Sequence, residues 1–147
     1  MKALLCSILL LASSAFSAEW NDHQLQDRVQ SEIKSVSPNI GRVEFTSVSL
    51  ADLRAWRLGM ESKFSKQDGW RCTTFADALY FYSKYMNHRA AVGVIWFFIH
   101  PDEKNHIAHA VNVFLDKENK LRFYDPMTQL ECHLTARQIE SIYYVLF

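Results

Sequence analysis

The sequence is poor in the residues that build many cofactor and metal sites, with three cysteines, four glycines and three prolines among its 147 residues. It has no glycine-rich phosphate-binding loop, no closely spaced pair of cysteines and no histidine pair on a predicted helix. Its 16 basic and 16 acidic residues balance, so no excess of positive charge favours nucleic acid or an anionic membrane surface. We therefore expect no cofactor, no metal ion and no nucleic-acid partner.

Long hydrophobic runs are also missing, apart from one near the amino terminus. A basic start at Lys2 precedes an apolar run over residues 3–11, and small residues follow as far as Ala18, which is typical of a secretory signal peptide. The run is too short to span a bilayer, since a spanning helix needs about 20 apolar residues. We predict a signal peptide over residues 1–18, whose cleavage removes Cys6. The mature chain is then exported to the periplasm or the cell exterior, without stable membrane insertion.

The remaining residues, 19–147, are enough for one ordinary hydrophobic core and therefore for a single domain. Apolar residues recur every three or four positions in four segments, which predicts helices over 22–34, 50–60, 72–86 and 136–143. Alternating or continuous apolar residues predict strands over 42–46, 90–99, 108–115 and 121–125. No element is predicted over 127–134. The pattern predicts an α+β domain in which helices flank an antiparallel β-sheet.

One cysteine stands at the start of a predicted buried helix, in the stretch Gly69-Trp70-Arg71-Cys72-Thr73-Thr74-Phe75-Ala76-Asp77-Ala78-Leu79. The turn signal Asp68-Gly69 precedes it, which places Cys72 in the first helical turn. The unpaired amides and the dipole of a helix start stabilise an anion there, and the thiolate is the nucleophilic form of cysteine. Cys72 is therefore a candidate nucleophile.

Two later residues lie on the predicted core side of strands. His109 shares a strand face with Val111 and Val113, and Asp125 shares a face with Phe123. Because an unpaired buried carboxylate is costly, we expect Asp125 to pair with His109. If the Cys72 helix packs on this side of the sheet, the thiol, imidazole and carboxylate converge at one end of the sheet.

These segments resemble a known superfamily. Trp70-Arg71-Cys72-Thr73-Thr74-Phe75-Ala76 at a helix start, His109-Ala110 opening a strand and Tyr124-Asp125-Pro126 closing the next are similar to the transglutaminase-like branch of the papain-like cysteine enzymes. The segments 109–114 and 124–129 also resemble the papain-like cysteine-protease domain attached to a fungal agglutinin. The similarity extends over residues 69–129.

The resemblance implies a papain-like or transglutaminase-like core and a thiol hydrolase with a Cys72/His109/Asp125 triad. Cys72 would attack a carbonyl carbon, His109 would carry the proton, and Asp125 would fix the imidazole. Gln67, five positions before the thiol, is a candidate oxyanion donor beside the backbone amide of Cys72. The substrate would be a peptide or protein, for which a cell-wall peptide is one candidate. Both an amidase or peptidase reaction and transglutaminase-like acyl transfer fit this chemistry.

Two alternatives stay open. Export leaves two cysteines in a compartment where disulfides form, so Cys72 and Cys132 could be bridged in a non-enzymatic binding or structural domain. His106 and His109 with Asp125 could also bind zinc. In the first alternative Cys72 performs no chemistry, so the state of its thiol separates the two functional classes.

Overall fold

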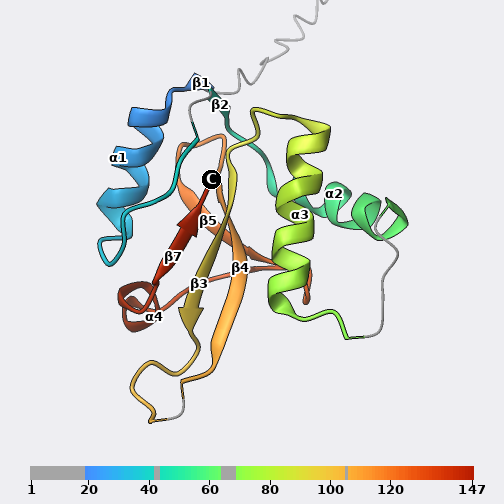
Figure 1. The fold of residues 1–147 in the computed structure, drawn as a ribbon. Helices are drawn as coiled ribbons and strands as arrows, with labels where there is room; N and C mark the ends of the chain where they lie inside the picture. The colour runs from blue at the N-terminus through green and yellow to red at the C-terminus, as the bar shows by residue number, and fades with distance from the viewer. Residues whose placement is uncertain (1–18, 42–43, 64–68, 105) are drawn as a thin grey trace, which may run out of the picture.

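The structure, a computed structural model, describes residues 19–41, 44–63, 69–104 and 106–147, so the predicted signal peptide and Gln67 lie outside the described residues. A five-stranded antiparallel sheet with strand order β6-β5-β4-β3-β7 forms the middle of the fold (Figure 1). The strands are β3 (Val92–Phe98), β4 (Ala108–Leu115), β5 (Leu121–Asp125), β6 (Leu130–Cys132) and β7 (Tyr144–Leu146). A second small sheet pairs β1 (Glu19–Trp20) with β2 (Phe45–Thr46).

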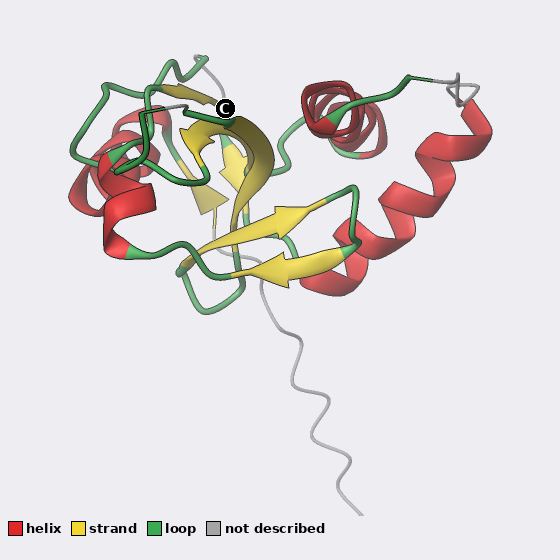
Figure 2. Cartoon of the chain, turned by 90° about the horizontal axis from the view of Figure 1, so that it is seen from below, coloured by secondary structure: helices red, strands yellow, loops and turns green. Residues whose placement is uncertain are grey.

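Helices lie on both sides of the large sheet. α1 (Asp22–Glu32) lies on one side, whereas α2 (Leu50–Lys63) and α3 (Cys72–Met86) lie on the other (Figures 1 and 2). The short α4 (Ala136–Glu140) precedes β7 along the chain. The described residues therefore form the predicted α+β fold, with antiparallel sheets and four helices. None of the helices in the described ranges has the length and apolar character that a membrane span requires.

Alternation along β4 divides the core into two layers. Val111 and Val113 belong to the buried cluster that includes Leu25 and Val29 of α1. Phe114 belongs to a second buried cluster, which holds residues of α2 and α3. Because successive side chains of a strand point to opposite faces, odd-numbered positions of β4 face α1 and even-numbered positions face α2 and α3.

The carboxyl-terminal end of the chain differs from its predicted form. The helix predicted over 136–143 ends at Glu140, and the next residues turn into β7, which pairs with β3. A methyl group added at Gly93 in β3 would collide with the carbonyl oxygen of Leu146, so the glycine allows the two strands to approach. This pairing joins residues far apart in the sequence, and the periodicity of a local segment cannot predict such a pairing. β6 likewise forms where the sequence predicted no element.

Candidate functional site

His109 and Asp125 form a partly buried pair at one end of the large sheet. His109 lies near the start of β4 and Asp125 is the last residue of β5, and their strands are neighbours in the sheet. The His109 Nε2 atom lies 3.2 Å from Asp125 Oδ2, and the two side chains are 19% and 14% exposed. The other carboxylate oxygen of Asp125 accepts a hydrogen bond of 2.8 Å from the backbone amide of Met127. Both oxygens of the carboxylate are therefore held.

These contacts favour the ionised form of Asp125. Burial alone raises the pKa of Asp125, but the hydrogen bond and charge of His109, together with hydrogen bonds from the amides of Met127 and Thr128, outweigh burial and hold the pKa below its usual value of 3.8. A carboxylate that stays ionised can orient the imidazole and stabilise its protonated form.

Cys72 lies at the first position of α3, as the sequence predicted, but on the other face of the sheet from the His109 side chain. Its side chain packs against the small cluster of Ala76, Val94 and Ala110, and Ala110 follows His109 in β4. The side chain of His109 instead contacts the ring of Phe97, with ring centroids 5.7 Å apart. The condition for convergence, that the Cys72 helix packs on the face of His109 and Val111, is therefore not met.

Two features of the sequence decide this placement of α3. Ala76 and Ala110 are both fully buried and leave room for the helix to approach the sheet. The buried side chain of Asn112 donates hydrogen bonds from Nδ2 to the carbonyl oxygens of Ala76, at 2.9 Å, and Gly93, at 3.1 Å. These bonds fasten the helix to the even-numbered face of β4. The thiol and the imidazole thus lie at the same end of β4, and no hydrogen bond joins them in the described part of the chain.

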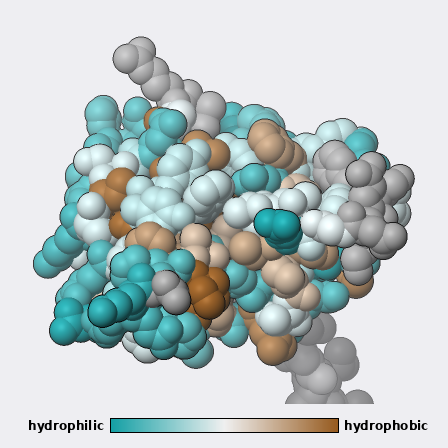
Figure 3. Space-filling model, turned by 60° about the horizontal axis from the view of Figure 1, so that its bottom comes forward, coloured by the Kyte–Doolittle hydropathy of each residue, from teal (hydrophilic) through white to brown (hydrophobic). Residues whose placement is uncertain are grey.

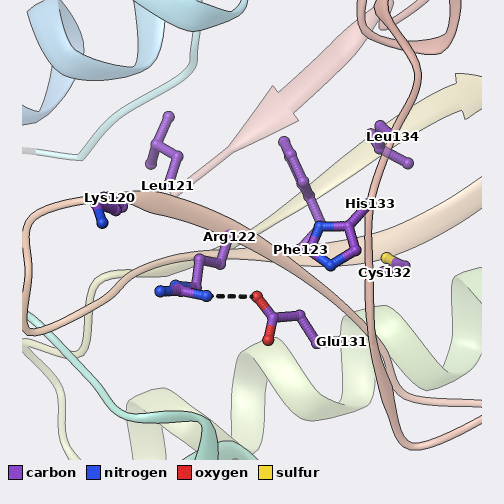
Figure 4. Close-up of a pocket in the computed structure, with 8 residues that line it drawn as sticks. All are labelled: Lys120, Leu121, Arg122, Phe123, Glu131, Cys132, His133 and Leu134. Carbon is purple, nitrogen blue, oxygen red and sulfur yellow. Dashed lines mark hydrogen bonds and ion pairs between the residues drawn. The ribbon is translucent and has the colours of Figure 1, made fainter.

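The second cysteine lies in a different environment. Cys72 and Cys132 are both free thiols, so the structure does not contain the disulfide of the alternative interpretation. Cys132 lines a hollow beside β5 and β6, next to the ion pair between Arg122 and Glu131 (Figure 4). Burial, and then the negative charge of Asp125, raise the pKa of Cys132 to about 12. This thiol is therefore protonated and poorly nucleophilic near neutral pH.

Gln67 and His106 are the remaining residues of the predicted sites. Gln67 lies outside the described residues, so its role as an oxyanion donor stays a prediction. His106 is exposed, and its ring lies 4.8 Å from the ring of Phe98, between ring centroids. Within the described ranges there is no group of three or more histidine, cysteine or acidic side chains arranged to hold a metal ion.

Arg57 is a buried residue near Asp125 that the sequence analysis missed. Its Nε donates a hydrogen bond of 2.5 Å to the carbonyl oxygen of Pro126, the residue after Asp125. The spacing of Leu53, Arg57 and Met60 contains the signal, because residues three and four apart share one helical face. An arginine between two core positions of an amphipathic helix predicts a buried, bonded guanidinium.

Comparisons with known proteins find structures with a similar fold but no family. No family model and no curated protein matches the chain. Two solved structures each match at 13% identity with a TM-score of 0.64. One is a Polyporus squamosus lectin bound to a human-type influenza-binding epitope, Neu5Aca2-6Galb1-4GlcNAc, and the other is a PSL1a–E64 complex. The match covers 88% of this chain and 49% and 51% of those chains, so this chain spans about half of their length.

At this identity the likeness shows a shared fold alone. It supports the predicted resemblance to a fungal agglutinin at the level of fold. Membership of the papain-like or transglutaminase-like superfamily, which the motifs around Cys72, His109 and Asp125 implied, finds no support in these comparisons.

Proposed function

We propose that the chain is an exported thiol hydrolase that acts on amide or isopeptide bonds through Cys72, His109 and Asp125. The observation that carries the proposal is the pair between His109 and Asp125, whose Nε2 and Oδ2 atoms lie 3.2 Å apart. The pair lies at the end of β4 against which Cys72 also packs. A helix-start thiol and an imidazole that a carboxylate orients are the groups that thiol acyl transfer needs.

In this proposal the two ring nitrogens of His109 have separate roles. When Nε2 donates its proton to Asp125 Oδ2, Nδ1 is unprotonated and can accept the proton of the thiol. The sulfur of Cys72 would then bond to the carbonyl carbon, and the proton on Nδ1 would pass to the departing amine as the carbon–nitrogen bond breaks. Water would cleave the resulting thioester, whereas an amine in its place would give acyl transfer.

The thiol and the imidazole must come closer for this reaction. Hydrogen bonds of catalytic groups are often long or misaligned without substrate and tighten in the substrate complex. Cys72 and the imidazole lie at one end of β4 but on opposite faces of the sheet, so we expect the first turn of α3 and the His109 ring both to move around this end of the strand into contact when substrate binds.

Carbohydrate binding without catalysis is a second candidate, and the comparisons favour this class over the enzyme. A matching structure of the same fold is a lectin with a bound glycan epitope. This chain also exposes aromatic rings: Tyr143 and Tyr144 are 43% and 40% exposed and lie 6.3 Å and 5.7 Å from the ring of Trp96, between centroids. Aromatic faces of this kind can stack on the C–H groups of a sugar ring. Apolar side chains also gather near the middle of one face of the molecule (Figure 3).

Reactivity of the two cysteines tests the first candidate. We would treat the protein near neutral pH with E64, an epoxide that alkylates thiolates, or with iodoacetamide, and locate the adducts by mass spectrometry. The enzyme interpretation predicts fast labelling of Cys72, loss of that labelling in His109→Ala, and no change in the matched control Cys132→Ser. Slow labelling of Cys72 that does not depend on His109 would refute it.

The second candidate makes a separate prediction. Glycan binding by the protein should persist in Cys72→Ser and be lost in Tyr144→Ala, as measured on an array of immobilised sialylated and neutral oligosaccharides. Absence of binding to every glycan would exclude this candidate, and it would leave the labelling result unaffected.

A further inference from the structure

Arg57 is a charged residue on the buried face of α2. Only 2% of its side chain is exposed, and Leu53 and Met60 on the same helical face are fully buried. Removing a guanidinium from water costs free energy unless the protein supplies bonds in place of the lost hydration. The contacts of Arg57 therefore show which groups replace its lost hydration.

Three contacts hold the guanidinium. Its Nε donates to the carbonyl oxygen of Pro126 at 2.5 Å. Its Nη1 lies 2.8 Å from Glu61 Oε1 in an ion pair along α2, although this contact is not aligned as a hydrogen bond. Its Cζ lies 4.7 Å from the centroid of the Phe75 ring. The first and third contacts reach two other segments of the chain.

Those two segments carry the candidate catalytic groups. Phe75 lies three residues after Cys72, and its amide closes the first turn of α3 by bonding the carbonyl oxygen of Arg71 at 3.0 Å. Pro126 follows Asp125, and the turn that it begins is also fixed by the bond from the Met127 amide to Asp125. Arg57 thus contacts both the helix start that carries Cys72 and the turn that carries Asp125.

We propose that Arg57 is a positioning residue of the thiol site, which fixes the turn after Asp125 against the first turn of α3. This inference rests on the proposed hydrolase function. Without the bond from Arg57 to Pro126, the turn after Asp125 loses this hydrogen bond to α2. The Asp125 carboxylate then no longer fixes the His109 ring relative to Cys72. Displacement of reacting groups by about 1 Å can lower a rate about 100-fold, so the effect on thiol reactivity is large.

A double-mutant cycle tests this role. Arg57→Met keeps an apolar stem of similar length and removes the charge and the bond to Pro126. We expect the rate of E64 labelling at Cys72 to fall about 10- to 100-fold in this variant. Because Arg57 acts through Asp125, we expect Arg57→Met to cause little further loss in an Asp125→Asn background. The matched control is Arg54→Met, one turn earlier on the exposed side of α2, which should label at the rate of the unmodified protein.

The outcomes separate this inference from the proposed function. Labelling of folded Arg57→Met at the unmodified rate, or a loss that adds fully to that of Asp125→Asn, overturns the positioning role. If Arg57→Met does not fold, as judged by circular dichroism, the same cycle with Arg57→Lys decides by the same criterion. Labelling of the unmodified protein that does not depend on His109 overturns both proposals, whereas His109 dependence without an Arg57 effect overturns only this one.

Discussion

Lys84 on α3 gives a prediction whose size follows from its surroundings. Its Nζ donates a hydrogen bond of 2.6 Å to the carbonyl oxygen of Ala90 and lies near the rings of Phe45 and Tyr80, at 5.4 Å and 5.1 Å from their centroids. Burial among these groups lowers the pKa of Lys84 from 10.5 to about 8. The protonated form of Lys84 is therefore less stable in the folded protein than in the unfolded chain.

The sign and size of the pH effect follow from this pKa. A tenfold change in proton affinity corresponds to about 1.4 kcal/mol, so the charge on Lys84 destabilises the folded state by about 3 kcal/mol at neutral pH. Above about pH 8, folded Lys84 loses its proton while the lysine of the unfolded chain keeps it until about pH 10.4. The unfolded state then binds more protons, so the contribution of Lys84 to stability rises with pH through this range.

A comparison with Lys84→Met isolates the pH-dependent contribution of Lys84 to stability. The free energy of unfolding in urea is measured for both proteins between pH 7 and about pH 10, below the ionisation of Tyr80, whose pKa burial and the nearby Tyr144 raise above 10.0. The stability of the unmodified protein relative to Lys84→Met should increase by about 2 to 3 kcal/mol across the range. The matched control is Lys63→Met, since Lys63 is exposed. A difference between Lys84→Met and the unmodified protein that does not change with pH would refute the reasoning.

Two further predictions concern the pair at the site and the packing of α3. The pKa of Asp125 is below its usual value in the folded protein, so the stability that Asp125 provides is fully present above about pH 4 and is lost as the pH falls through the folded pKa. Urea unfolding should show Asp125→Asn to be about 1 kcal/mol less stable than the unmodified protein at pH 6. A difference in stability that persists unchanged at pH 2 would contradict this. Ala76 is fully buried against Val94 and Ala110, so Ala76→Leu should lower the free energy of unfolding by about 1 to 3 kcal/mol, whereas Thr74→Leu at an exposed position of the same helix should change it by less than about 0.5 kcal/mol.

The central strands and the long helices could be predicted because their signals are local. The spacing of Leu25 and Val29 predicted α1, and the start of α3 at Cys72 followed from a turn signal and an apolar stripe. β4 and β5 followed from runs of apolar residues separated by a short polar turn. Each of these patterns lies within about fifteen residues, which is the range over which side-chain periodicity acts.

The short pairings at the sheet edges could not be predicted in the same way. β7 forms because Tyr144–Leu146 meet β3, about fifty positions earlier in the chain, and Gly93 leaves room for them. β6 forms because Leu130–Cys132 meet the edge of β5. These segments are too short to show a period of their own, so only the tertiary pairing makes them strands.

In the candidate site, too, some features followed from the sequence and others only from the tertiary structure. The sequence by itself determined the helix-start position of Cys72 and the pairing partners His109 and Asp125, because a buried carboxylate on an apolar strand face needs a partner. Only the tertiary structure decided on which face of β4 the thiol helix packs, since the alternation of a strand defines two faces but not which helix covers each. Small side chains at Ala76 and Ala110 and the bonds of Asn112 made that choice.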